Sequence, residues 1–302
     1  MIGGSRGLGY ELVKQLASTD RFSHIFFTFN KSHQKSILQI ENQLSTKQTI
    51  VKGFHCNFNH LDSIPQLVDS CVKYNKKEDD EMMKMDVLVN NVGMTFNQPF
   101  LRSNLEMLDQ ILNVNLKAPF LLSKLITKHN ISYNRLHQGV KKKVKDEFKI
   151  VNIGSLLSSL KNLDELEMLV GSSYYTISKY GLVGLTKSIS HEIGRFGGNV
   201  TCVCPSFIKT DLIENDDLTK QRIKKQIEFI HTSYDDDDKR GDDDDNLVVK
   251  LSNYYQKRDQ RSDNILDDDF LLLSPFQVSD WIVKNIILSK TKIQNGSIID
   301  II

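Results

Sequence analysis

The sequence of 302 residues has few cysteines, little proline and almost no net charge. Four cysteines cannot form a disulfide scaffold for a chain of this length, which favours a reducing compartment. With 39 Lys and Arg against 38 Asp and Glu, the net charge of +1 gives no global attraction to nucleic acid, membrane surfaces or acidic ligands. Apolar runs are strand-sized and shorter than the roughly 18 residues of a membrane span. We therefore expect neither a membrane protein nor a nucleic-acid-binding one.

Opposite charges are concentrated in two segments of the chain. Eight aspartates and only two basic residues lie between 235 and 245, and a lysine cluster lies between 141 and 145. Such charge runs are typical of solvated insertions. We expect one domain over 1–302 with polar insertions near 137–149, 158–170 and 214–268.

Short apolar runs alternate with helical patterns over the first two thirds of the chain. The strands are expected over 24–30, 49–58, 85–90, 149–154 and 199–204, and helices over 61–71, 103–128 and 173–196. Strands that are apolar on both faces and separated by helices indicate a parallel sheet covered on both sides. The sequence therefore predicts a doubly wound α/β fold.

A glycine-rich segment precedes the first helical pattern. Its members are Gly3, Ser5, Arg6, Gly7, Leu8 and Gly9. Glycines allow a backbone to approach a pyrophosphate, and a helix N-terminus offers free N–H groups to it. A flexible chain start would look the same, so this segment alone leaves nucleotide binding and a structural role equally open.

The type of nucleotide is indicated by the end of the first expected strand. Asn30 and Lys31 follow it, without a carboxylate to hold a ribose 2′-hydroxyl, and Arg6 lies in the glycine segment. A 2′-phosphate requires cations, so these residues favour NADP over NAD. The alternative is that Lys31 is an ordinary surface lysine.

Tyr175 and Lys179 are four residues apart in a helical pattern. On one helix face, the ammonium of Lys179 would favour the ionised form of the Tyr175 phenol and assist proton exchange. The spacing alone is weak evidence, since Tyr10 and Lys14 repeat it. Tyr175 is distinguished by context, because Ser155 ends an apolar strand at the edge where ligands bind in doubly wound folds. A turn serine is the plain alternative for Ser155.

These features together resemble the short-chain dehydrogenases/reductases. The residues that carry the resemblance are Gly3, Gly7, Gly9, Asn90, Asn91, Gly93, Asn115, Ser155, Tyr175, Lys179, Pro205 and Thr210. Their order along nearly the whole chain matches that family. The resemblance implies a Rossmann sheet, a nicotinamide cofactor and an Asn, Ser, Tyr, Lys tetrad.

Residue roles follow from the same resemblance. Tyr175 would give a proton to the substrate carbonyl, Ser155 would hydrogen-bond that oxygen, and Asn115 would support a water. Lys179 would hold the nicotinamide ribose. Asn57, Asn91 and Gly93 would lie at the adenosine side, and Pro205 and Thr210 at the nicotinamide end.

Within the family, the sequence is most similar to 3-oxoacyl-acyl carrier protein reductases and related carbonyl reductases. The segments 100–102, 151–155 and 181–185 carry this likeness. It implies NADPH-dependent reduction of a 3-oxoacyl thioester in fatty acid synthesis, an acyl carrier protein as partner and a homo-oligomer. A general carbonyl or pterin reductase and a non-catalytic NADP-binding protein are the alternatives. The compartment is left open between cytoplasm and mitochondrion.

Two departures from the family pattern are visible, and the cysteines bear on a separate expectation. Only Met1 and Ile2 precede the glycines, so the first strand is expected to be truncated, as in an incomplete gene model. Twenty positions separate Ser155 from Tyr175, which leaves Ser158 or Ser159 as alternatives for the serine role. The cysteines lack a second Cys/His pair at metal spacing, and no metal is expected.

Overall fold

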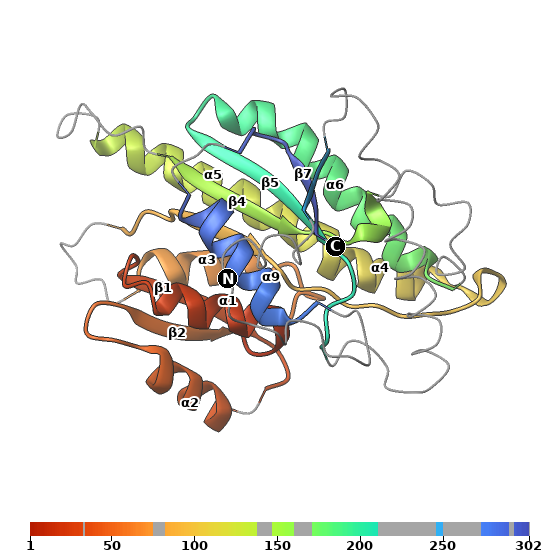
Figure 1. Cartoon of the computed structure of the whole chain (residues 1–302), viewed down its shortest axis with the longest axis horizontal. Helices are drawn as coiled ribbons and strands as arrows, with labels where there is room; N and C mark the ends of the chain where they lie inside the picture. The colour runs from red at the N-terminus through yellow and green to blue at the C-terminus, as the bar shows by residue number, and fades with distance from the viewer. Residues whose placement is uncertain are drawn as a thin grey trace, which may run out of the picture.

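The computed structural model describes residues 1–32, 34–74, 82–137, 147–159, 171–210, 246–249, 273–289 and 293–301. Within them, parallel strands and flanking helices form an α/β fold of the doubly wound type (Figure 1). The expected fold class is confirmed. Most of the three expected insertions, including both aspartate runs and Lys141 to Lys145, lies outside the described residues.

The smaller sheet pairs β1 (His24–Phe29) with β2 (Ile50–His55) in parallel, and His24 lies opposite Ile50. The helices α1 (Gly7–Ala17) and α2 (Gln34–Leu44) precede the two strands. Apolar side chains on both faces of β1 explain why this strand is covered rather than exposed.

The larger sheet has the order β3-β4-β5-β7-β6, and every neighbouring pair is parallel. Its strands are β3 (Val87–Asn90), β4 (Phe148–Ile153), β5 (Gly198–Pro205), β6 (Asn246–Val249) and β7 (Ile298–Ile301). The strand β6 lies inside the range 214–268, which the sequence suggested was a polar insertion. Four residues next to an aspartate run, three of them apolar, form a strand because β7 pairs with them in parallel.

Residues Met1 to Gly4 connect the two sheets. The Ile2 amide donates to the Val89 carbonyl at 2.9 Å, and the Thr28 amide donates to the Met1 carbonyl at 3.1 Å. Gly4 in turn donates to the Thr28 carbonyl at 3.0 Å. This short segment therefore lies between β1 and β3 at their carboxyl ends.

The remaining helices cover both faces of the sheets. They are α3 (Ser63–Val72), α4 (Leu105–Leu112), α5 (Ala118–His137), α6 (Ser173–Gly194) and α9 (Pro275–Ile282). The helix expected over 103–128 is divided by a π-helical turn at Asn113–Lys117 and continues to His137. No helix among the described residues has the length and apolarity needed to cross a membrane.

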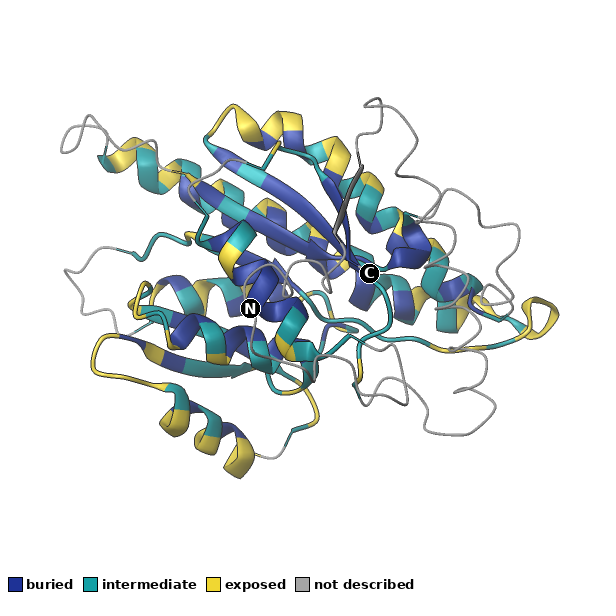
Figure 2. Ribbon diagram, viewed as in Figure 1, coloured by how far each residue is buried: buried dark blue, intermediate teal, exposed yellow. Residues whose placement is uncertain are grey.

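Two apolar clusters cover opposite faces of the strands. One joins α1 and α9 to the sheets, with Leu12, Phe27 and Ile282 fully buried. The other joins α3, α5 and the π-helical turn between α4 and α5 to β3 and β4, with Ile64 and Ile150 fully buried. Figure 2 shows the buried residues concentrated in the strands of the larger sheet and the helix faces turned toward them. These clusters hold the carboxyl ends of the strands in fixed positions.

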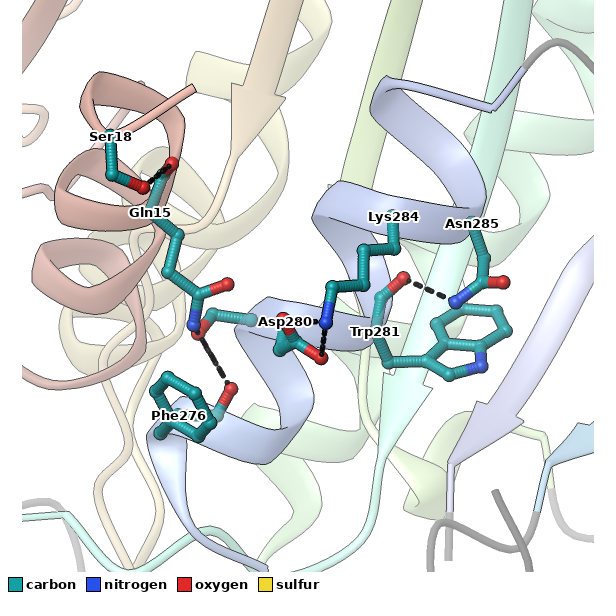
Figure 3. A network of polar contacts seen from close by, with 8 residues as sticks. Gln15, Ser18, Phe276, Asp280, Trp281, Lys284 and Asn285 are labelled. Atoms are coloured by element: carbon teal, nitrogen blue, oxygen red, sulfur yellow. Dashed lines mark hydrogen bonds and ion pairs between the residues drawn. The ribbon is translucent and has the colours of Figure 1, made fainter. Parts of the chain in front are cut away.

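Polar contacts supplement the packing of α1 against α9. The Gln15 side-chain nitrogen donates to the Phe276 carbonyl at 3.2 Å and to the Ser279 hydroxyl at 2.6 Å (Figure 3). Lys284, in the π-helical turn Val283–Ile287 that continues α9, forms an ion pair with Asp280 of α9 at 2.7 Å. The two helices are far apart in sequence, so the contacts of Gln15 connect a helix near the beginning of the chain to one near its end.

Candidate functional site

The sequence-predicted site residues follow the carboxyl ends of parallel strands. Asn30 follows β1, Asn91 follows β3, Ser155 follows β4, and Thr210 follows β5. Because the paired strands run in the same direction, their carboxyl ends lie at one edge. This edge is therefore the candidate site.

The glycine segment is fixed against β1 and β3. The Gly3 amide donates to the Thr28 hydroxyl at 2.9 Å, and the Asn91 side-chain nitrogen donates to the Gly3 carbonyl at 2.8 Å. A Cβ atom on Gly9 would lie only 1.8 Å from the Gly3 oxygen, so this position requires glycine. The turn leads directly into α1, so the N-terminal N–H groups of this helix lie at the site edge.

Four other members of the predicted nucleotide set occupy different environments. Gly7 has a positive φ of 54° and lies beside Thr210, whose methyl carbon would be 3.4 Å from a Cβ on Gly7. Leu8 has its side chain in the core, so only its backbone faces the segment. Pro205 is buried at the end of β5. Thr210 is thus brought to the glycine segment, whereas the Leu8 and Pro205 side chains are structural.

The residues expected to select the nucleotide lie beside the glycine segment. The Ser32 hydroxyl donates to the Ser5 hydroxyl at 3.1 Å, which joins the loop after β1 to the segment containing Arg6. Asn30 donates to Asn57 at 3.5 Å, so the loops after β1 and β2 also meet. Arg6 and Lys31 are both exposed. A pyrophosphate with a 2′-phosphate fits these glycine, N–H and cationic groups.

Lys179 lies beneath Tyr175 on α6. Its ammonium is buried, donates to the Ile153 carbonyl at 2.7 Å and is 5.6 Å from the centre of the Tyr175 ring. A Cβ on Gly93 would lie 3.5 Å from the Lys179 nitrogen. The structure thus brings α6, the end of β4 and the loop after β3 together around one cation, and an ammonium beside a phenol assists proton transfer.

The Asn115 side chain is fully buried in the π-helical turn. Its oxygen accepts from the Met94 amide at 2.9 Å, and its nitrogen donates to the Met94 carbonyl at 2.9 Å and to the Ser178 hydroxyl at 2.9 Å. These contacts use the side chain for holding the loop after β3 against α6. The resemblance to the family implied that Asn115 supports a water, and it did not indicate that Asn115 joins the loop after β3 to α6.

Three serines follow β4, and their surroundings differ. Ser155 is half-buried and accepts a hydrogen bond from the Leu157 amide at 3.4 Å. The Ser158 hydroxyl is buried and donates to the Ser155 carbonyl at 2.6 Å. The Ser159 hydroxyl donates to the Leu156 carbonyl at 3.1 Å. Ser155 therefore has a half-buried hydroxyl whose hydrogen is not used in these contacts, while the hydroxyls of the other two serines donate to local backbone.

A buried amide network below the site was missed at the sequence level. Asn90 donates to the Asn152 oxygen at 2.8 Å, and Asn152 donates to the Thr186 hydroxyl on α6 at 2.8 Å. Because unpaired buried amides are costly, such a network fixes α6 relative to β3 and β4. The available signal was an asparagine within the apolar strand Phe148–Ile153.

The four cysteines are free, and three are buried. The hydrogen bond with Cys202 and burial raise the pKa of Cys204 well above its ordinary value, and burial raises the pKa of Cys71 to about 12. Burial also raises the pKa of Cys56. Among the described residues, no three metal-binding side chains are grouped as a metal site.

These thiols should react slowly in the folded protein, since the thiolate is the nucleophile. We expect native protein at neutral pH to consume much less than one equivalent of a disulfide reagent within the time that urea-unfolded protein needs to consume four. Absorbance of the released thiolate measures both reactions. Rapid stoichiometric labelling of the native protein would contradict the described burial.

The chain is similar to proteins of one family. Residues 1–221 match the family model described as short chain dehydrogenase. The chain is 28% identical over 227 residues to 3-oxoacyl-[acyl-carrier-protein] reductase FabG of Rickettsia bellii, which covers 74% of this chain and 78% of the relative. A reductase with the same description from Aquifex aeolicus is 29% identical over 228 residues, covering 74% and 79%.

Solved structures support the same fold. A short-chain dehydrogenase/reductase from Serratia marcescens has a TM-score of 0.66 at 18% identity, covering 99% of this chain and 93% of that one. A Burkholderia cenocepacia short chain dehydrogenase in complex with NADP also has a TM-score of 0.66 at 18% identity, covering 99% and 94%. The family model, the described fold and the motif order agree: the chain belongs to the short chain dehydrogenase family of oxidoreductases.

Proposed function

We propose that the protein is an NADPH-dependent reductase of ketones, with 3-oxoacyl thioesters as its substrate class. The observation that carries this proposal is the buried Lys179 ammonium, fixed by the Ile153 carbonyl and lying 5.6 Å from the Tyr175 ring centre at the site edge. A phenol beside a held cation is suited to donate a proton to a ketone oxygen as negative charge develops there.

NADPH, when bound, would supply the hydride, and the chain's own residues would bind and orient the reactants. The Tyr175 hydroxyl donates the proton to the carbonyl oxygen, and the Ser155 hydroxyl hydrogen-bonds the same oxygen. Lys179 holds the nicotinamide ribose and stabilises the phenolate left on Tyr175. Asn115 keeps the loop after β3 beside Lys179, through its bonds with Met94.

The phosphate end of the cofactor would lie on the glycine segment. Gly3, Gly7 and Gly9 provide close backbone approach there, and Arg6 with Lys31 provides the positive charge for a 2′-phosphate. Asn57, Asn91 and Gly93 would line the adenosine side, and Thr210 would contact the nicotinamide end. The contact between Ser32 and Ser5 supports this placement because it holds the Lys31 loop against the glycine segment.

The choice of nicotinamide cofactor is tested by removing the two cations. We expect the Arg6→Ala/Lys31→Ala double variant to lose about 10- to 100-fold in the preference for NADPH over NADH, since each of the two contacts, made by an exposed side chain, contributes about 0.7 to 1.4 kcal/mol. Fluorescence titration of both cofactors measures the preference. Lys14→Ala is the control, because Lys14 lies on the helix that follows the glycine segment but is paired with Glu11 at 3.5 Å. An unchanged preference in the double variant would contradict the assignment.

The thioester part of the proposal comes from the two relatives reported above, both of which carry the description 3-oxoacyl-[acyl-carrier-protein] reductase. An acyl carrier protein would then deliver the substrate. We expect the purified protein to oxidise NADPH when an acetoacetyl thioester is added, which the fall in NADPH absorbance at 340 nm measures. Preferential turnover of simple ketones or pterins would instead assign a general carbonyl or pterin reductase.

A non-catalytic NADP-binding protein is a second candidate, and the division of the strands into two sheets favours it. The short Met1 to Gly4 segment must then hold the two halves of the site together. NADPH binding without turnover of any of these substrates would identify this second function.

A further inference from the structure

Ser178 on α6 has a hydroxyl with two partners. It is fully buried, donates to the Tyr175 carbonyl at 2.7 Å and accepts from the Asn115 side-chain nitrogen at 2.9 Å. One bond therefore lies within the helical turn that carries Tyr175. The other joins that turn to the π-helical turn between α4 and α5.

The contacts continue from Asn115 to the opposite wall of the site. Asn115 makes two bonds with the backbone of Met94, which directly follows Gly93. A Cβ on Gly93 would be 3.5 Å from the Lys179 nitrogen and 3.8 Å from the Asn115 oxygen. A single buried hydroxyl thus connects the Tyr175 backbone with the loop that borders Lys179.

We propose that Ser178 is a positioning residue, whose hydroxyl sets the placement of Tyr175 and Lys179 against the loop after β3. The activity readouts for this inference rest on the proposed reductase function. Removing the hydroxyl leaves the Asn115 nitrogen with one partner fewer in a buried place, where an unpaired donor is costly. The loop and α6 then move apart to recover a bond, and Lys179 loses its fixed position beneath Tyr175.

Ser190 offers a matched control on the same helix. It is also buried, and its hydroxyl donates to the Lys187 carbonyl three residues earlier at 2.8 Å. Within the described part of the chain, its hydroxyl has no second bond of the kind that Ser178 makes with Asn115. A merely helical role would give Ser178→Ala and Ser190→Ala the same effect.

The test compares these two variants in pH profiles and in kinetics. We expect Ser178→Ala to lower kcat about 10- to 100-fold, as displacement of catalytic groups does, with KM for the ketone changed much less. Its pH–rate midpoint should shift, whereas Ser190→Ala should keep the wild-type midpoint. Ser178→Thr retains the hydroxyl and should restore the wild-type midpoint.

Cofactor binding separates this inference from the proposed function. If the wild-type protein turns over no ketone, the reductase proposal fails, yet fluorescence titration still reports the placement of Lys179 through the affinity for NADPH. We then expect a several-fold weaker affinity in Ser178→Ala than in Ser190→Ala. Equal affinities, equal pH midpoints or a Ser178→Thr midpoint that follows Ser178→Ala would overturn the positioning role.

Discussion

Replacing Tyr175 by phenylalanine is expected to lower kcat for ketone reduction by about 10²- to 10⁴-fold, the usual contribution of a general acid. The phenylalanine ring fills the same space above Lys179 but has no proton to donate. Affinity for NADPH should change far less, because the glycine segment and the Lys179 ammonium remain. Steady-state kinetics at saturating cofactor measure the loss.

Tyr10 provides the matched control for that substitution. It shares the four-residue spacing to a lysine, but Lys14 is paired with Glu11 on α1 rather than held at the end of β4. Tyr10→Phe should therefore leave kcat within about twofold of the wild type, as surface substitutions usually do. Equal losses in the two variants would show that the Tyr175 phenol has no special part in turnover.

Replacing Gly9 by alanine is expected to abolish cofactor binding and to lower the free energy of unfolding by about 3 kcal/mol, the upper range for overpacking. The added Cβ would lie 1.8 Å from the Gly3 oxygen and 2.6 Å from the Asn91 side-chain nitrogen. The nearest atom belongs to backbone and cannot rotate away. The glycine segment would have to move from β3, which removes its N–H groups from the phosphate position.

Gly184 on α6 is the control for this effect. A Cβ there would meet no atom within 4 Å, so Gly184→Ala should stabilise the helix by about 1 kcal/mol and leave cofactor affinity unchanged. Urea unfolding and fluorescence titration measure both variants. Normal NADPH affinity in Gly9→Ala would contradict the close packing of the segment.

Much of the fold could be predicted from the sequence because the strands in the first two thirds of the chain are apolar on both faces. This pattern predicted β1 to β5 and the parallel α/β class, which the structure and the family confirm. The strand β6 was not predicted. Its four residues follow an aspartate run, and only its parallel pairing with β7 makes them a strand.

The site was predicted in part: the sequence indicated contacts between residues close together in the chain, but not contacts between distant segments. The spacing of Tyr175 and Lys179 is local and gave the cation beside the phenol. The bond between Lys179 and the Ile153 carbonyl and the clamp of Asn115 on Met94 join distant segments. No periodicity in the sequence encodes such contacts. The hydrogen-bonding roles of Ser178 and Asn152 are therefore visible only in the structure.

We propose that this chain uses Tyr175, supported by Lys179, to reduce ketones with NADPH. The most direct test follows NADPH oxidation at 340 nm with an acetoacetyl thioester, in wild-type and Tyr175→Phe protein prepared side by side. We expect turnover by the wild type, and a loss of about 10²-fold or more in the variant with NADPH binding retained. NADPH binding by both proteins without turnover by either, or equal turnover by both, would contradict it.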